Sequence, residues 1–247
     1  MLRLSKKSSM FRSLFAAFTF CASLSAAAQT TVFDPNAQPR TVGSFTAISV
    51  SGGIDLYISQ GNEEAVVVSA RTDEFRDAIK TEVKNGTLRI WFAWRDGRSW
   101  TLGNNKQLKA YVSYKTLKAL SAAGGSDVFV DGTLQAENLS LAVSGGSDFA
   151  GKVAVGELQV SASGGSDVDI NGRTGKLNID ASGGSDVDGF ELVADECTVN
   201  ASGGSDVEVT VTGKLQANAS GGSDVVYKGA ADRVQINKSG GGSVRKG

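Results

Sequence analysis

Hydrophobic and polar residues alternate along the second half of the chain, and a short motif interrupts the alternation at near-regular intervals. The string Gly-Gly-Ser-Asp occurs six times, 18 to 21 residues apart. Its copies begin at Gly124, Gly145, Gly164, Gly183, Gly203 and Gly221. A degenerate copy follows at Gly241-Gly242-Ser243, and Ser51-Gly52-Gly53-Ile54-Asp55 is another near the start. A fixed period of this length is typical of repeat architectures.

The pattern around each motif predicts two strands. Residues five, three and one positions before the Ser that precedes each Gly pair are apolar, apart from Lys238 in the last copy. The first of these positions holds Leu139, Leu158, Leu177, Cys197, Leu215 and Val234. A second strand starts after each Asp with Val128, Phe149, Val168, Val187, Val207 and Val225. The residues in between are mostly polar, and this period-two alternation indicates half-buried strands.

Each repeat is thus predicted to contain a strand, a Gly-Gly-Ser-Asp corner, a second strand and a polar turn. Asn171-Gly172-Arg173 and Thr212-Gly213-Lys214 are examples of that turn. One repeat cannot bury its apolar face alone, but stacked copies share a continuous core. Parallel stacking at ~4.8 Å per coil places like residues on like residues. We therefore predict a right-handed parallel β-helix with coils of about 19–20 residues.

The first half of the chain is less regular but is also typical of β-structure. Predicted strands cover Phe45–Val50, Ile54–Gln60, Ala65–Ala70, Thr87–Trp94, Leu108–Tyr114 and Thr116–Ser121. A short helix is expected over Asp73–Ile79, and Asn85-Gly86 is typical of a tight hairpin. We expect one domain over residues 40–238, with an irregular cap at 40–123 and regular repeats at 124–238. Flexible segments are expected at 29–39 and 239–247.

Residues 1–28 have the three parts of an export signal. Its positive charges are Arg3, Lys6, Lys7 and Arg12. An apolar stretch over Leu14–Leu24 is followed by a cleavage site at Ala26-Ala27-Ala28. The apolar stretch is shorter than the ~18 residues of a membrane-spanning helix. We expect the signal, with Cys21, to be removed, which leaves an exported protein without a membrane span in the periplasm, on the outer-membrane surface or outside the cell.

Composition excludes several kinds of chemistry. The 247 residues include 31 Gly and no His, so Ser-His-Asp and Cys-His nucleophiles and His-containing metal sites are ruled out. Removing the signal changes the net charge from −1 to about −5, which disfavours nucleic acid and anionic membranes as partners. Cys197 then has no other Cys to pair with. Because it lies in the inward Leu column, we predict a buried structural thiol.

A family resemblance follows from these motifs. The run Ile48-Ser49-Val50-Ser51-Gly52-Gly53-Ile54-Asp55-Leu56-Tyr57-Ile58-Ser59-Gln60-Gly61, followed by iterated Ser-Gly-Gly-Ser-Asp-Val, resembles the head GIN-domain family of putative autotransporter adhesins. The resemblance covers roughly residues 40–230. It implies an exported bacterial β-helix protein with an adhesin-like role, and it brings no catalytic residues.

The Asp residues of the motifs predict a column of carboxylates. Its members are Asp127, Asp148, Asp167, Asp186, Asp206 and Asp224. In register they would stand ~5 Å apart and repel by about 1 kcal/mol or more per neighbouring pair. Bound Ca²⁺ would relieve this repulsion, because it prefers carboxylate and carbonyl ligands. The favoured alternative is structural: Asp and Ser bond nearby backbone N–H groups as Asx- and Ser-turns, while Gly supplies positive φ.

All three Trp residues fall within ten positions. Trp91, Trp94 and Trp100, with Arg95 among them, form a candidate ligand-binding cluster. Exposed aromatic rings beside a cation can stack on sugar rings, which suits an exported binding protein. The alternative is that these rings plug the end of the β-helix or form a contact between two copies.

Paired carboxylates are the remaining catalytic candidates, because many β-helices act on polysaccharides. Asp167 with Asp169 and Asp186 with Asp188 are such pairs, but we expect the two members of each to point to opposite faces. We therefore predict a non-catalytic, adhesin-like module that binds a cell-surface or envelope component, with no cofactor beyond the candidate Ca²⁺. The alternatives are a polysaccharide-binding or polysaccharide-active β-helix with a glycan ligand, and a structural envelope assembly protein that forms homo-oligomers.

Overall fold

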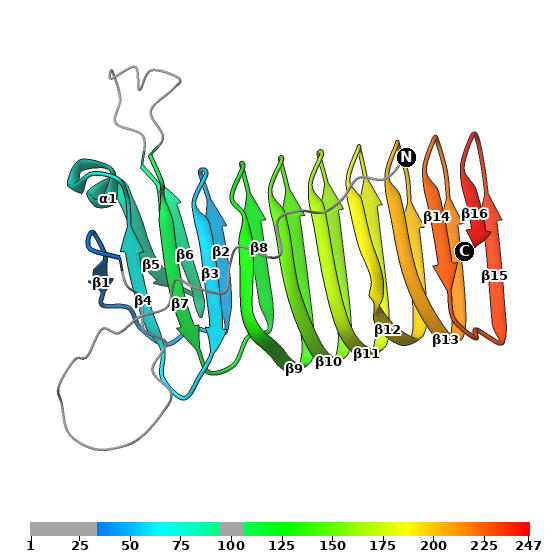
Figure 1. Cartoon of the computed structure of the whole chain (residues 1–247), viewed down its shortest axis with the longest axis horizontal. Coiled ribbons are helices and arrows are strands. Elements are labelled where there is room, and N and C mark those ends of the chain that lie inside the picture. Colours follow the sequence, from blue (N-terminus) through cyan, green and yellow to red (C-terminus); the bar gives the residue numbers. More distant parts are fainter. Residues whose placement is uncertain (1–33, 94–105) are drawn as a thin grey trace.

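Each Gly-Gly-Ser-Asp motif folds into a tight corner between two strands, and the corners line up along one edge of the molecule (Figure 1). The structure, a computed structural model, describes residues 34–93 and 106–247. The coils stack into a β-solenoid of about seven turns, each of about 19 residues. The parallel β-helix predicted from the repeat is therefore confirmed.

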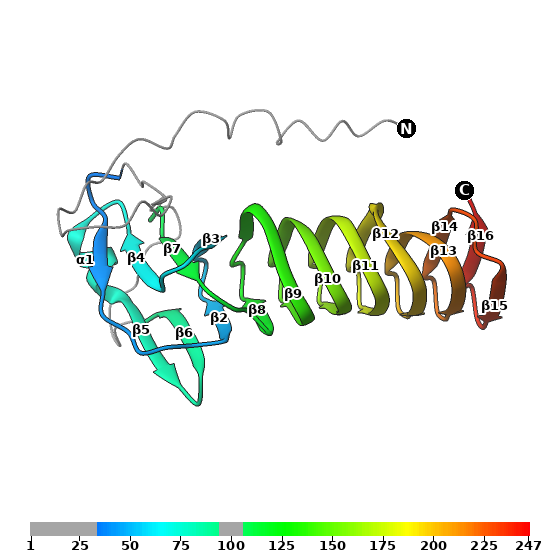
Figure 2. The ribbon, with the colours of Figure 1, turned by 90° about the horizontal axis from the view of Figure 1, so that it is seen from below.

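Five long strands build the regular part. They are β9 (Val128–Ser144), β10 (Asp148–Ser163), β11 (Asp167–Ser182), β12 (Asp186–Ala201) and β13 (Asp206–Ala219). Neighbouring strands pair in parallel with like residues in register, as Leu158 with Leu177 and Val168 with Val187. Each strand runs along one face of the solenoid and continues on the other (Figure 2).

The two faces are named here by the side chains they expose. The Asp face begins after each corner and carries Asp127 and its equivalents. The Asn face leads into the next corner and carries Asn200, Asn218 and Asn237. Shorter strands extend both: β14 (Asp224–Lys228) and β16 (Ser243–Lys246) on the Asp face, and β15 (Arg233–Lys238) on the Asn face.

The polar turns predicted opposite the Gly-Gly corners are bends within continuous strands rather than breaks between two strands. Asn171-Gly172-Arg173 lies inside β11, where each residue pairs with its counterpart in β10. Thr212-Gly213-Lys214 likewise lies inside β13. The strand bends there without a break, because the parallel pairing to the next coil continues around the bend. Coils of unequal length are accommodated by irregular register, such as the shift between Gly189 and Val193 in β12.

The first half of the chain supplies shorter strands that overlap the six predicted ones. They are β2 (Ala47–Ser51), β3 (Asp55–Gln60), β4 (Ala65–Ser69), β6 (Thr87–Phe92), β7 (Lys109–Tyr114) and β8 (Ala119–Ala123). The predicted helix is α1 (Asp73–Ala78), capped by the Thr72 hydroxyl, which accepts the N–H of Phe75 at 3.3 Å. The sequence did not predict β5 (Ile79–Lys84), which pairs with β6 through the predicted Asn85-Gly86 hairpin.

The coils of the first half are not stacked in the order of the sequence. Strand β2 pairs with both β6 and β8, and β3 pairs with both β7 and β9. The β2–β3 coil therefore lies between the β6–β7 coil and the β8–β9 coil. Antiparallel β4 and then β1 (Gln38–Arg40) follow β7, and α1 lies at the same end of the solenoid (Figure 1).

The core is a continuous stack of inward side chains, with buried hydroxyls at the corners. The Ser of every motif is fully buried: Ser126, Ser147, Ser166, Ser185, Ser205 and Ser223. The Ser185 hydroxyl, for example, donates to the carbonyl of Ala162 in the preceding coil at 3.1 Å and contacts that of Ser182 at 3.0 Å. These hydroxyls provide partners for backbone groups that are buried at the turn.

Both segments expected to be flexible contain ordered strands. Residues 239–247 form another corner and then β16, which pairs with β14 and places Val244 in register with Val225. Strand β1 begins within the segment 29–39, at Gln38, and pairs with β4. In both places, the segment is ordered by backbone pairing to a neighbouring strand. The export signal predicted at 1–28 lies outside the described residues.

Candidate functional site

The motif carboxylates form a column along the Asp face, in the register that the repeat predicted. Backbone pairing aligns Asp148, Asp167, Asp186, Asp206 and Asp224 in successive coils. Asp127 precedes them, and its Oδ1 accepts the N–H of Asp148 at 3.3 Å. The sequence reasoning missed that Asp55 continues the column by one coil and that Lys109 follows Asp55.

A second acidic column runs beside the first, formed by Asp169, Asp188 and Glu208. Our expectation that Asp167 and Asp169 face apart was wrong, because residues two apart in a strand share a face. Both side chains are exposed on the Asp face. Desolvation and then repulsion by Asp188 raise the pKa of Asp169, while desolvation and then Asp148 raise the pKa of Asp167.

These columns spread carboxylates along rows rather than around a point. Among residues 34–93 and 106–247, no three His, Cys, Asp or Glu side chains form a group that could hold a metal ion. The Ca²⁺ site predicted for the motif Asp residues therefore stays a prediction. The structural alternative was that motif side chains accept backbone N–H groups, and the Ser166 hydroxyl does accept the N–H of Ser163 at 3.1 Å. The hydroxyls of Ser185 and Ser205 instead contact backbone carbonyls at 3.0 Å.

The structure describes one member of the predicted aromatic cluster. Trp91 is half-buried in β6, and the guanidinium carbon of Arg89 lies 5.6 Å from the centre of its ring. Arg89 also pairs with Glu82 at 2.8 Å. Trp94, Arg95 and Trp100 lie outside the described residues, so a ligand-binding role for this cluster stays a prediction.

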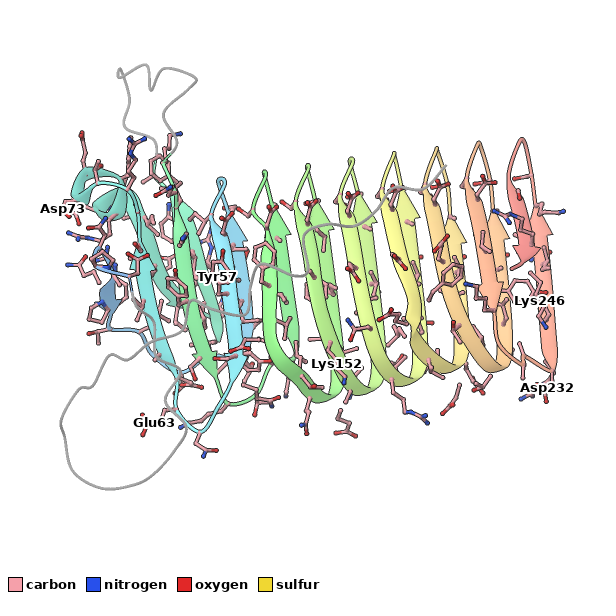
Figure 3. The ribbon with its side chains drawn as sticks, in the orientation of Figure 1. Tyr57, Glu63, Asp73, Lys152, Asp232 and Lys246 are labelled. Atoms are coloured by element: carbon pink, nitrogen blue, oxygen red, sulfur yellow. The ribbon has the colours of Figure 1, made fainter. Side chains whose placement is uncertain are left out.

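The sequence analysis missed a different aromatic row, on the Asp face. Tyr111, Tyr57 and Phe129 stack in successive coils, with ring centres 5.2 Å apart at both contacts. Tyr57 lies on the face turned toward the viewer in Figure 3. Desolvation, then Asp55 and Asp127, raise the pKa of Tyr57 to about 12. Tyr57 and Phe129 could have been found from the sequence, since they stand two residues after Asp55 and Asp127.

A ladder of side-chain amides runs along the Asn face. Asn200 donates through Nδ2 to Asp180 at 2.9 Å, Asn218 to Asn200 at 2.8 Å, and Asn237 to Asn218 at 2.8 Å. All donors point toward the preceding coil. This column was visible in the repeat alignment as outward polar residues, but only the paired coils show that the amides join.

A groove lies between this amide ladder and the Gly-Gly corners. It has a volume of about 330 Å³ and is floored by the buried Ala201 and Ala219. The polar side chains along it are Asn200, Ser202, Asn218, Ser220, Asn237 and Ser239. Small residues on the floor and short polar ones at the sides leave room for a ligand. We call this the amide groove; of its lining residues, only Lys238 is charged.

The described residues include no helix that is long and apolar enough to cross a membrane.

Cys197 is buried in the inward column, as predicted, and desolvation raises the pKa of its thiol to about 12. Neither Cys197 nor the Ser residues of the corners are therefore placed as nucleophiles.

Solved structures share this architecture. A putative adhesin from Bacteroides fragilis is 21% identical, with a TM-score of 0.78 and coverage of 85% of this chain and 95% of that one. A putative adhesin from Parabacteroides distasonis is 22% identical, with a TM-score of 0.66 and coverage of 85% and 96%. A putative lipid binding protein from the same species is 20% identical, with a TM-score of 0.59 and coverage of 87% and 98%. At these identities the likeness concerns the fold.

None of the curated proteins is significantly similar to this chain. The family described as "Putative auto-transporter adhesin, head GIN domain" matches over residues 44–231, which includes every motif copy from Gly52 to Gly221. The match also spans both the irregular coils and the regular repeats. With the family match covering most of the solenoid, the chain belongs to the head GIN-domain family of putative auto-transporter adhesins.

Proposed function

We propose that this protein is a non-catalytic adhesion module of the cell envelope and that it binds a surface glycan along the amide groove. The observation that supports this most directly is the groove itself, with ordered amides on one side and Ser hydroxyls on the other. Membership of an adhesin family agrees with an exported protein that contacts a surface component.

The amides of the ladder are suited to a ligand rich in hydroxyl groups. Asn218 uses one N–H toward Asn200 and one oxygen lone pair toward Asn237, which leaves one donor and one acceptor site free for a ligand. Successive coils repeat this pair at ~4.8 Å. Because the ladder fixes the amide planes, little side-chain entropy is lost when hydroxyls of a sugar bind.

The groove lacks the side chains that general acid–base catalysis requires. Its lining holds no carboxylate, and the chain has no His to act as general base. The acidic pairs on the Asp face repeat in adjacent coils, so no single pair is set apart as a catalytic centre. Binding without chemistry is therefore the function that these residues support best.

A glycan array probed with the full chain tests this proposal. The groove variant Asn218→Ala/Ser220→Ala removes an amide and a hydroxyl, and we expect its signal on the bound glycans to fall about tenfold. The matched control is Gln159→Ala, an exposed residue of the same face outside the groove, and its profile should equal that of the wild type.

Equal profiles for the wild type and the groove variant would contradict the proposal. Loss of binding in Trp94→Ala, with the groove variant unaffected, would assign the ligand to the predicted Trp cluster instead. Release of reducing ends from a bound polysaccharide would show that the protein is a polysaccharide-active enzyme.

A further inference from the structure

The coil formed by β15 and β16 exposes apolar side chains that other coils bury. Val234 and Ile236 are 42% and 38% exposed, and among the described residues they are the most exposed of the large hydrophobic side chains. They are in register with Leu215 and Ala217, which are fully buried. Within residues 34–93 and 106–247, β15 pairs only with β13, so its outer edge carries free backbone groups (Figures 1 and 2). We call this the open edge.

Basic residues outnumber acidic ones around the open edge; the acidic neighbour, Asp232, has its Oδ1 3.6 Å from Arg233 Nε, with both side chains exposed to water. Lys238 occupies an inward position that Ala201 and Ala219 fill in the preceding coils. Arg245 and Lys246 belong to the neighbouring β16, and Lys246 lies at this end of the molecule with Asp232 in Figure 3. A cation at an inward position disfavours stacking of another apolar coil.

An outward column of alternating charge also ends here. Glu157, Lys176, Glu196, Lys214 and Arg233 are in register in successive coils. Glu157 and Lys176 pair at 3.1 Å. The alternation of sign breaks at Lys214 and Arg233, so an acidic residue beside Arg233 would resume it.

The amide ladder gives the open edge a hydrogen-bonding requirement as well. Since every amide donates toward the preceding coil, the ladder ends on the acceptor oxygen of Asn237. A strand placed beyond β15 would continue the ladder if it supplied an amide donor at that position.

We propose that the open edge binds an extended acidic peptide segment of another protein as an added parallel strand. Backbone hydrogen bonds supply affinity in this mode, and alternate side chains supply specificity. The segment places apolar residues against Val234 and Ile236 and carboxylates beside Arg233 and Lys238. An Asn or Gln of the segment lies beside Asn237.

A second copy of this chain fits the open edge less well. Two copies joined edge to edge would bring Arg233, Lys238 and the β16 cations of both into contact. The opposite end of the solenoid offers α1 and the short β1, in which Pro39 has no N–H to donate. Charge thus disfavours edge-to-edge pairing of two copies, and the lack of a regular strand edge among the described residues at the opposite end disfavours head-to-tail stacking.

The test uses two fluorescent peptides and the full chain. The acidic peptide Glu-Leu-Gln-Val-Asn-Glu begins with the sequence of residues 157–160 and matches the open edge in register. The control is Lys-Leu-Gln-Val-Asn-Lys, which differs only in its charges. Measured by fluorescence anisotropy, the acidic peptide should bind about tenfold or more tightly than the control.

Reversing the charges in the protein is the decisive experiment. Arg233→Glu/Lys238→Glu should reverse the preference and bind the basic peptide, which a general loss of folding cannot produce. Equal binding of both peptides, or none, would overturn the proposal. So would a dimer of the wild type in sedimentation that this double variant abolishes. Glycan binding at Asn218 and Ser220 is scored separately, so failure here and failure of the proposed function are distinguishable.

Discussion

The side chain of Gln60 pairs with the backbone of Gln135 as though it were a piece of strand. Gln60 Nε2 donates to the carbonyl of Gln135 at 3.1 Å, and the N–H of Gln135 donates to Gln60 Oε1 at 2.9 Å. The same Nε2 reaches the carbonyl of Lys115 at 3.2 Å. Gln60 thus connects the β2–β3 coil to the segments before β8 and within β9, where the stacking order departs from the sequence.

We expect Gln60→Ala to lower the free energy of unfolding by about 1–2 kcal/mol. Net hydrogen bonds of this kind contribute about 0.5–1.5 kcal/mol each, and the site is exposed to water. Urea denaturation measures the change. Gln159→Ala, an exposed Gln on the Asn face, serves as control and should change stability by less than about 0.5 kcal/mol. A similar loss in both variants would show that the Gln60 bonds are not special.

The first Gly of one corner, Gly203, and the second Gly of the preceding corner, Gly184, should differ in their tolerance of Ala. Gly203 has φ +76°, and an added Cβ would lie 2.7 Å from the carbonyl oxygen of Gly183. We expect Gly203→Ala to cost about 2 kcal/mol or more, from the left-handed backbone and the contact together. At Gly184 an added Cβ meets nothing within 4 Å. Thermal melting of Gly184→Ala should therefore show equal or slightly raised stability, and equal losses at both positions would contradict this account.

The acidic column should make the protein more stable at acidic than at neutral pH. Desolvation, then Asp148 and Asp186, raise the pKa of Asp167 in the folded state. A carboxyl group whose pKa is higher in the folded than in the unfolded protein stabilises the fold at pH values below its unfolded pKa of 3.8. That stabilisation is lost as the pH rises through its folded-state pKa.

Asp167→Asn should therefore raise the free energy of unfolding at pH 7 by up to about 1 kcal/mol, with little effect near pH 3.5. Denaturation at the two pH values measures this. Asp131→Asn, outside both acidic columns, is the control. A destabilised Asp167→Asn at pH 7 would show that this carboxylate has a favourable partner, as a bound cation would provide.

The thiol of Cys197 should be unreactive until the solenoid opens. Its pKa of about 12 leaves almost no thiolate at pH 8, and the side chain is buried. Iodoacetamide labelling, located by peptide mass in a Cys21→Ser background, should be absent in native protein and complete in guanidinium. Labelling of the native protein within minutes would mean that β12 and β13 separate readily.

The regular coils could be predicted from the sequence because each coil repeats the constraints of the last. The inward Leu, Val and Ala columns and the Asp column followed from alignment alone. The order of the first coils did not, because β2 carries no signal that identifies β6 and β8 as its two neighbours. The stacking order depends on contacts between residues distant in sequence, such as Gln60 of β3 with Gln135 of β9.

Part of the candidate site was also present in the sequence but was not recognised. The Asn column of the amide ladder was classed as outward polar residues, since the joining of amides depends on their relative orientation. Val244 repeats the position of Val225, yet the residues around it were expected to be a tail. The predicted Trp cluster, by contrast, rested on proximity in the sequence, and only Trp91 of it lies in the described residues.

The position of the β2–β3 coil has a consequence for how the chain acquires its structure as it is synthesised. This coil is made first, but the strands on its two sides come later: one edge stays unpaired until β7 has been made, and the other until β9 has been made. The first half must therefore assemble in one cooperative step that joins distant segments. Each later coil then needs only the one before it, and growth along the axis becomes a series of local additions. A defect in the first half would stop the protein from forming, whereas one in the last coils would only shorten it.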